Sequence, residues 1–498
     1  MTASSYPSAT IRVIPFPAGL GAVCPRPEGA LEWPPTQLTY LEVYLRSLGC
    51  ATIVVETHYV DRDFVDDFAR YYARAMRSYQ NFATRLHFFT ESFTEDAWRA
   101  LIAASADGHR DARTAWLQDR YLGFCVVRPL PASPIGRTVL KTVGPLSDGG
   151  HERVFGGARE YTVHLCGLDL KVAGLAFQQQ DQGVSACATT ALWSALQCVA
   201  SAERMHIPTP GEITDAASRY VLTDGRSMPS EGLRVEQICE ATRAAGLAPV
   251  VVRSVSLEQD RVQLMSYVRS GFAPVLALSV GGGGHAVCCV GLKLGDIRPQ
   301  TDPNLHFQDA ASRVEGLYIH DDRLGPYASV ELFSDTRPGP GSVRTSLLIR
   351  WPDNVDNEVA ILQSIIVPLP PKVRLSVTRM RALGLPIAEV AAALDEIDGP
   401  VTLDVRYERA VQYKQRAYEF GLSAEGLYQL QCELPLSRYV GLIEIASPVG
   451  PLFDAVLDTT DSGANPCALA LVRRAQLPAA AVRHLEVLTT IFGARRIV

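Results

Sequence analysis

The chain has 498 residues, more than a single hydrophobic core usually supports, so its length predicts two or three domains. Hydrophobic residues make up 47% of the chain and charged residues 20%, which excludes a largely disordered protein. The formal net charge of -6 provides no broad positive field, so we expect neither nucleic acid nor an anionic membrane surface as a partner.

The sequence gives no signal of export, membrane insertion or metal binding. The first residues have no basic opening or apolar segment, and no later run approaches roughly 18 consecutive apolar residues. The 11 cysteines are scattered, odd in number and without CxxC spacing. We therefore expect a soluble, cytoplasmic protein with reduced cysteines and with no metal or other cofactor.

Residues 1–154 are predicted to form an N-terminal α+β domain of unknown role. Apolar residues recur at helical spacing in 38–48 and in 63–81, and the second range predicts one long helix with an aromatic, core-facing stripe. Strands are expected at 51–56, 86–89 and 124–130.

Residues 155–370 are predicted to form a second α+β domain, and residues 371–498 a smaller C-terminal α+β region of unknown role. In the middle of the chain helices come first and several strands later, an order that does not alternate as a parallel sheet requires. The C-terminal region contains no catalytic motif. The expected elements are a strand or hairpin in 161–174, helices at 188–202, 234–245, 257–270 and 387–394, and strands in 271–280, 285–294 and 316–322.

Cys187 is the first candidate for chemistry. It lies between a glycine-containing loop and a run of residues with helical spacing, so its thiol is expected at or near a helix N-terminus. Unpaired backbone N–H groups and the positive end of the helix dipole favour the thiolate there. Taken alone, the cysteine is more simply a small core residue, because free cysteines are among the most buried side chains.

His285 is the second candidate. It follows four glycines, residues 281–284, and begins a predicted strand, which is a rigid mount for a base. The glycines lack the strand-to-helix context of a phosphate-binding loop, so no nucleotide site is implied.

A pair of carboxylates supplies the third candidate. Asp321 and Asp322 end the predicted strand in 316–322. A carboxylate there can accept a hydrogen bond from the histidine ring, fix its tautomer and stabilise the imidazolium. Aspartates at a strand end are otherwise common turn formers, and this reading suits one of the two.

The order Cys, His, Asp in these contexts resembles papain-like cysteine peptidases. Within them it is most similar to the compact bacterial group that processes bacteriocin leader peptides. The resemblance covers roughly residues 170–335 and rests on the strings HAVCCVG, ACATTAL and GFAPVLAL. It implies a central papain-like domain in which an N-terminal helix carries the cysteine and an antiparallel sheet carries the histidine and the aspartate.

The resemblance also assigns roles to the candidates. Cys187 matches the nucleophile, His285 the base and Asp321 the orienting acid, with Asp322 in reserve. The intervals are 98 residues from Cys187 to His285 and 36 from His285 to Asp321. The first interval is shorter than the one in papain, as expected for a compact member of this family.

One position departs from the family pattern. The glutamine that stabilises the oxyanion usually lies six residues before the cysteine, where this chain has Asp181. Gln180 and Gln182 flank that position, and a change of one residue in loop length would bring either amide into place. Gln180 is slightly favoured.

These assignments predict hydrolysis of a peptide or isopeptide bond through a thioester, with a polypeptide as substrate and no cofactor. The flanking regions are expected to supply substrate recognition, restraint or a contact for a regulatory protein. Two alternatives use the same fold: a transamidase or deconjugating amidase, and an inactive papain-like protein that acts as a binding module or scaffold.

Overall fold

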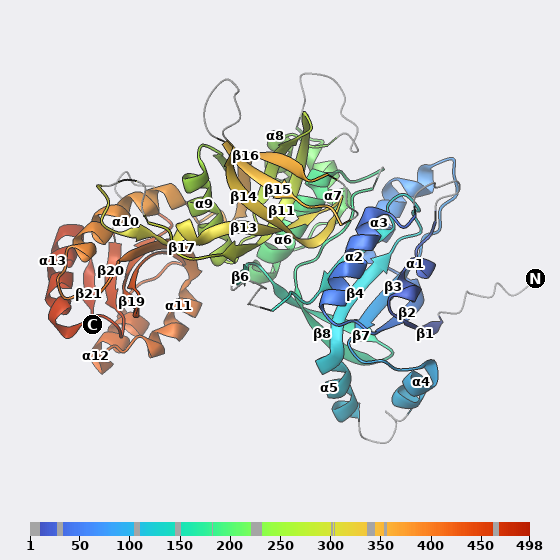
Figure 1. The fold of residues 1–498 in the computed structure, drawn as a ribbon, viewed down its shortest axis with the longest axis horizontal. Coiled ribbons are helices and arrows are strands. Elements are labelled where there is room, and N and C mark those ends of the chain that lie inside the picture. The colour runs from blue at the N-terminus through green and yellow to red at the C-terminus, as the bar shows by residue number, and fades with distance from the viewer. Residues whose placement is uncertain are drawn as a thin grey trace, which may run out of the picture.

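The computed structural model describes residues 10–26, 33–103, 110–144, 151–181, 183–220, 232–299, 302, 304–335, 344–352, 356–461 and 468–498. The molecule is elongated and has three lobes in chain order (Figure 1). We call residues 10–144 the N-terminal lobe, 151–369 the central lobe and 370–498 the C-terminal lobe. The mixture of helices with mainly antiparallel strands confirms the predicted α+β class.

The N-terminal lobe is built on a five-stranded antiparallel sheet whose strands are neighbours in chain order. Every residue of its fourth strand is buried, because packing covers both faces of the sheet there. The strands are β1 (Ile11–Pro15), β2 (Thr52–Tyr59), β3 (Ala83–Phe89), β4 (Tyr121–Val127) and β5 (Ile135–Leu140). The helices are α1 (Ala18–Val23), α2 (Thr36–Ser47), α3 (Arg62–Arg70), η1 (Tyr72–Arg74), α4 (Glu95–Ala103) and α5 (Arg110–Arg120).

The long helix predicted over residues 63–81 is wrong. The helix α3 ends at Arg70 and is followed by the single turn η1. The buried Tyr72 ring packs between Phe64 and Tyr79, at centroid distances of 6.4 and 4.9 Å. Packing of aromatic rings from two short segments therefore takes the place of one continuous helical stripe.

The central lobe contains a closed barrel of six antiparallel strands. The strand β10 pairs with β11 on one side and with β16 on the other, which completes the circle β10–β11–β13–β14–β15–β16. Closure leaves the barrel strands without free edges along most of their length. The barrel strands are β10 (Val275–Val280), β11 (Gly283–Leu294), β13 (Val314–Asp321), β14 (Gly325–Asp335), β15 (Arg344–Ile349) and β16 (Glu358–Leu369).

Two further strands extend this sheet, and helices cover it. The strand β6 (Glu152–Phe155) pairs with β11, although it precedes the boundary predicted at residue 155, and β9 (Ala248–Arg253) pairs with β16. The segment predicted as a strand or hairpin is a hairpin of β7 (Arg159–Leu165) with β8 (Leu168–Gly174). The helices are α6 (Cys187–Glu203), α7 (Pro210–Ala217), α8 (Val235–Ala244) and α9 (Leu257–Arg269), with the turn η4 (Ala310–Arg313).

The C-terminal lobe has a six-stranded sheet that begins in the central part of the chain. The short strand β12 (Gln308–Asp309) pairs in parallel with β17 (Thr402–Arg409). The sheet continues through β18 (Tyr439–Ser447), β19 (Gly450–Asp458), β20 (Ala468–Arg473) and β21 (Arg495–Ile497). The helices are α10 (Val377–Ala392), α11 (Ala410–Arg416), α12 (Ala424–Tyr428) and α13 (Val482–Phe492), with the short η5 (Ala417–Glu419), η6 (Gln429–Glu433) and η7 (Ala479–Ala481).

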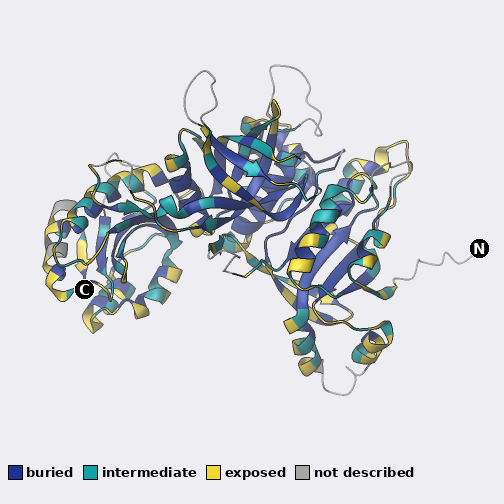
Figure 2. Cartoon of the chain, viewed as in Figure 1, coloured by how far each residue is buried: buried dark blue, intermediate teal, exposed yellow. Residues whose placement is uncertain are grey.

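One continuous cluster of buried apolar side chains runs through all three lobes. Figure 2 shows buried strands inside each lobe and exposed positions on the outer helices. Among the described residues, no helix is both long enough and apolar enough to cross a membrane. The lobes are therefore packed on one another through apolar side chains, and this packing positions the candidate site.

Candidate active site

Cys187 is the first residue of α6 and is half-buried. The Thr189 hydroxyl accepts a hydrogen bond from the Ala186 N–H at 3.3 Å, and the Thr190 hydroxyl donates to the Cys187 carbonyl at 2.9 Å. These bonds fix the first turn, while residues 188–200 of the helix are buried against the lobe's core. The prediction of a helix that begins near this cysteine is confirmed, and the thiol lies at the positive end of the helix dipole.

His285 lies near the start of β11 and is 9% exposed. Its Nε2–H donates to Asp321 Oδ1 at 3.0 Å, and the Cys187 side chain lies near enough to contribute to the raised pKa of His285. Because Nε2 is engaged by the carboxylate, Nδ1 is the nitrogen that remains for the sulfur. Cys187, His285 and Asp321, which are far apart in the sequence, therefore lie together at one site.

The pair of His285 and Asp321 is strongly coupled. Burial by itself lowers the pKa of His285, but the charge and hydrogen bond of Asp321 outweigh it and raise the pKa to about 10. Burial by itself raises the pKa of Asp321, but the charge and hydrogen bond of His285 outweigh the effect of burial and hold the pKa of Asp321 well below its usual range. At neutral pH the pair is an imidazolium and a carboxylate.

Asp321 is held in place by the turn that it begins. Its Oδ1 accepts the Arg323 backbone N–H at 3.0 Å, and its carbonyl accepts the Leu324 N–H at 2.9 Å. The turn joins β13 to β14, which pair as a hairpin. The same residue thus forms the turn and orients the histidine.

Asp322 occupies a different environment. Its Oδ1 is 3.9 Å from His285 Nε2, beyond hydrogen-bonding distance, and both carboxylate oxygens are buried without a hydrogen bond from any described residue. Burial first, and then repulsion from Asp321, raises the pKa of Asp322 to about 7. The geometry assigns the histidine to Asp321 and leaves Asp322 as a neighbour of the pair.

Arg323 is a component that the sequence reasoning missed. Its Nε lies 3.3 Å from Asp321 Oδ1 and 3.1 Å from His285 Nε2, and its Nη2 donates to Asp321 Oδ2 at 3.1 Å. The same guanidinium forms an ion pair with Glu358 at 3.0 Å. A basic residue directly after two acidic ones was the available signal, although nothing in the local sequence aims its side chain back at Asp321.

The same cluster also brings potential metal ligands together. His285, Asp321 and Asp322 offer ligand atoms that all lie within 4.8 Å of one another. The Arg323 guanidinium, however, already donates to both oxygens of Asp321. A divalent cation among the three residues would lie beside that positive charge, so the arrangement fits an acid–base pair better than a metal site.

The loop before Cys187 explains the departure at Asp181. The Asp181 Oδ1 accepts the backbone N–H groups of Gly183, Val184 and Ser185 at 2.9, 2.6 and 3.1 Å. This carboxylate therefore shapes the loop that leads to the nucleophile and is not available as an oxyanion donor.

The glutamines before Cys187 differ in their burial and in their hydrogen bonds. Gln180 is half-buried, and Gln182 lies outside the described residues. Gln178, which sequence reasoning passed over, is 3% exposed, and its Nε2 has no hydrogen-bond partner among the described residues.

Arg128, which follows β4 in the N-terminal lobe, is the second component that sequence reasoning missed. This 2% exposed side chain donates to the Ser133 carbonyl at 2.8 Å and to the Gln179 carbonyl at 3.0 Å. Its Nη1 lies 3.9 Å from Asp181 Oδ2. The N-terminal lobe therefore holds the glutamine-rich loop through a buried cation.

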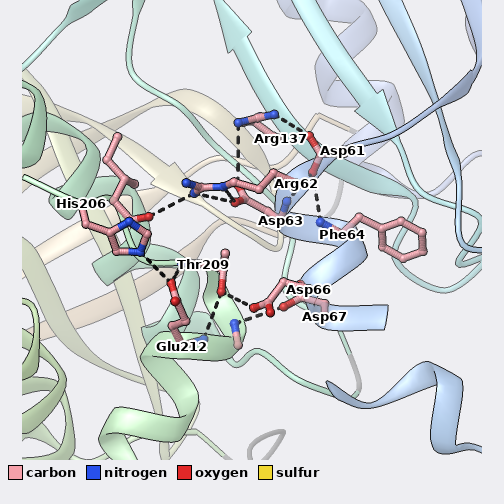
Figure 3. Close-up of polar contacts among 12 residues, drawn as sticks. Asp61, Arg62, Asp63, Phe64, Asp66, Asp67, Arg137, His206, Thr209 and Glu212 are labelled. Carbon is pink, nitrogen blue, oxygen red and sulfur yellow. Dashed lines mark hydrogen bonds and ion pairs between the residues drawn. The ribbon is translucent and has the colours of Figure 1, made fainter. Parts of the chain in front are cut away.

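The same lobe is fastened to the central lobe by polar contacts between α3 and the start of α7 (Figure 3). Asp67 accepts the Gly211 N–H at 3.1 Å, and the Thr209 hydroxyl donates to Asp66. Burial first, and then the nearby Asp181, raises the pKa of Asp67 well above its ordinary value. The charge of Asp181, in the loop before Cys187, therefore acts on Asp67 in the interface between the two lobes.

The N-terminal lobe contacts the site from two sides. A Cβ placed at Gly183 would lie 2.6 Å from the Tyr71 ring, so that ring packs directly on the loop before Cys187. The Gln37 side chain donates to the Asp322 carbonyl at 3.3 Å, on the loop after Asp321. Both loops that carry the site are therefore packed against the first lobe.

The glycine run before His285 divides into two parts. Gly281 and Gly282 form the two-residue turn between β10 and β11, with φ values of 55° and 85° that favour glycine. Gly283 and Gly284 belong to β11, and a Cβ at Gly284 would meet no atom within 4 Å. The backbone next to the histidine is therefore open to approach.

No protein-family model matches the chain, and no curated protein matches it significantly. The interpretation of the site therefore depends on its own geometry.

Proposed function

We propose that the chain is a papain-like cysteine peptidase that hydrolyses a peptide or isopeptide bond through a thioester intermediate. The observation that carries the proposal is the grouping of Cys187, His285 and Asp321, in which a thiol at a helix N-terminus lies near an imidazolium paired with a buried carboxylate. This is the set of groups that nucleophilic acyl transfer requires.

The proposed reaction has two halves. The proton of the thiol rests on His285, and the Cys187 sulfur attacks the amide carbonyl to form a tetrahedral oxyanion. The Cys187 backbone N–H and the amide of Gln180 stabilise this oxyanion. The carbon–nitrogen bond then breaks as His285 gives its proton to the leaving amine, and an acyl-enzyme remains. In the second half His285 takes a proton from water, which attacks the thioester and releases the acid and the thiol.

An extended polypeptide is the proposed substrate because the approach to the histidine is open along a strand. Gly284 directly precedes His285 and presents no side chain, and space is free around it. A peptide backbone can therefore come close to β11 at the point where the base is mounted. Exposure of a half-buried thiol beside this strand is consistent with attack on a main-chain carbonyl.

The test compares the reactivity of two cysteines in the same folded chain. Iodoacetamide labelling is followed by peptide mapping, with the exposed Cys432 as internal reference. We expect Cys187 to react faster than Cys432 at pH 6, and His285→Ala to abolish this difference without changing Cys432. Equal reactivity of the two thiols in the unmodified chain would contradict the proposal.

Hydrolysis is measured separately with a mixture of peptides analysed by mass spectrometry. Cleavage is expected in the unmodified chain and absent in Cys187→Ser, while Gln180→Ala lowers kcat by about 100-fold to 1000-fold with labelling of the thiol unchanged. Gln179→Ala is the matched control, because Gln179 Oε1 accepts the Ile135 N–H and serves the fold. Products joined to an added amine would indicate a transamidase, and reactive thiol with no turnover would favour a binding module.

A further inference from the structure

A cavity of about 500 Å³ lies between the central and C-terminal lobes and shares no residue with the candidate active site. Helices α9 and α10, which contact each other at the junction of these lobes in Figure 1, form two of its walls. Its volume is within the range of small-molecule sites. Its polar lining includes Arg261, Gln263, Arg298, Ser312, Thr378 and Arg381.

Arg261 is the feature that points to a ligand. The residue is 7% exposed, and its Nε is buried without a hydrogen-bond partner. Within the described part of the chain, its guanidinium forms neither a hydrogen bond nor an ion pair, while the side chain lines the cavity. A buried cation without a partner is costly, and an anion in the cavity would remove that cost.

The two other arginines of the lining differ from Arg261 because each already has a carboxylate. Arg298 pairs with Glu315 at 3.2 Å, and Arg381 pairs with Asp309 at 2.9 Å. Burial first, and then Arg298, lowers the pKa of Arg261. Glu315 and Glu258, of which Glu258 lines the cavity, act on Arg261 through their charge, but neither forms a described ion pair with it. Arg261 is therefore the one arginine of the three whose guanidinium has no carboxylate in direct contact among the described residues.

Neutral groups complete the polar side of the cavity. Gln263 Nε2 donates to the Thr378 hydroxyl at 3.1 Å, which leaves the hydroxyl proton of Thr378 available to a ligand. Ser256, Glu258, Gln259 and Asp309 also line the cavity, and its apolar wall is formed by Val262, Pro299, Ala311, Ala382 and Leu385. A ligand that matches both sides has one anionic group and an apolar body.

We propose that this cavity binds a small organic anion, a phosphate ester or a carboxylate, whose charged group pairs with Arg261. The site bridges α9 of the central lobe and α10 of the C-terminal lobe. Its occupant therefore contacts both lobes, and the inference does not depend on the proposed peptidase activity.

The experiment measures binding to the full chain by calorimetry at low ionic strength. The probes are phenyl phosphate, benzoate and inorganic phosphate, each at millimolar concentrations. We expect at least one of the two organic anions to bind with one-to-one stoichiometry, and Arg261→Gln to weaken that binding at least about tenfold. Arg243→Gln is the matched control, because Arg243 lies on α8, pairs with Glu240 and is largely exposed.

The three probes separate the possible sources of the anion. Binding of phenyl phosphate and inorganic phosphate but not benzoate identifies a phosphate site, and binding of both organic anions identifies a site for any anion on an apolar body. No binding of any probe, or equal binding to the Arg261→Gln variant, overturns the proposal.

The Tm of the Arg261→Gln variant tests whether it loses binding only because it is destabilised. Without ligand, Arg261→Gln is expected to have an unchanged or higher Tm, since it removes a buried charge that has no partner. A purely structural arginine predicts a lower Tm, and that result would also overturn the proposal.

Discussion

Replacing Asp321 with asparagine removes the negative charge opposite His285 and nearly preserves the shape of the side chain. A rise in the pKa of His285 from 6.5 to about 10 corresponds to roughly 5 kcal/mol in favour of the charged ring. Burial opposes this rise, so in the variant the pKa of His285 falls, with only Cys187 and Asp322 left to raise it. We expect Asp321→Asn to lower the free energy of unfolding by about 3 to 5 kcal/mol near pH 6.

The loss should depend on pH in a defined direction. The pKa of His285 is raised in the folded state, so its contribution to stability is fully present below pH 6.5 and is lost as the pH rises through about 10. The pKa of Asp321 is lowered, so its contribution is present above pH 3.8 and is lost as the pH falls further. The effect of Asp321→Asn is therefore largest between these two limits and shrinks toward pH 10, where the lost contact to Arg323 leaves a residual cost.

Urea unfolding at pH 6 and pH 10, followed by tryptophan fluorescence, measures this difference. Asp322→Asn is the matched control and should act in the opposite direction. The pKa of Asp322 is raised to about 7 by burial and then by Asp321, so the folded chain loses stability as the pH rises from 3.8 through 7. The neutral variant avoids that loss and should be more stable by about 1 to 4 kcal/mol above pH 7, with little effect near pH 4. An equal loss for Asp321→Asn at both pH values, or destabilisation by Asp322→Asn at pH 8, would refute the assignment of the two carboxylates.

Two further predictions concern the loops around the site. Arg128→Met should lower the free energy of unfolding, measured in urea, by about 3 to 5 kcal/mol. The variant leaves the buried carboxylate of Asp181 and two backbone carbonyls without their cation. A loss under about 1 kcal/mol would contradict the role given to Arg128. Gly284→Ala should leave the Tm unchanged, since the space around Gly284 is open, but should raise KM for peptides by obstructing the backbone beside His285. Gly281→Ala is the control. Because Gly281 has a positive φ, this variant should lower stability by about 1 kcal/mol and leave KM unchanged. The same shift of KM in both variants would show that the obstruction is not local.

The sequence determined the local parts of this protein. Apolar residues at helical spacing after Cys187 predicted α6, and the alternating pattern in 161–174 predicted extended structure, a strand or a hairpin, where β7 and β8 lie. The paired aspartates at the end of the predicted strand were recognised as turn formers, and the structure has a turn at Asp321. These features were predictable because backbone preference and side-chain periodicity act over a few residues.

Tertiary structure decided the rest, because it depends on contacts between residues far apart in the chain. The end of α3 at Arg70 followed from aromatic packing and not from local propensity, and closure of the barrel required β10 to pair with β16, about 90 residues further along. The part played by Arg128 also had no local signal, since a single arginine after a strand is common and only the fold brings it to Asp181. A thiol, a ring and a carboxylate can be suggested by motif, but the protonation states of the ring and the carboxylate follow from burial and from neighbours such as Arg323 that only folding supplies.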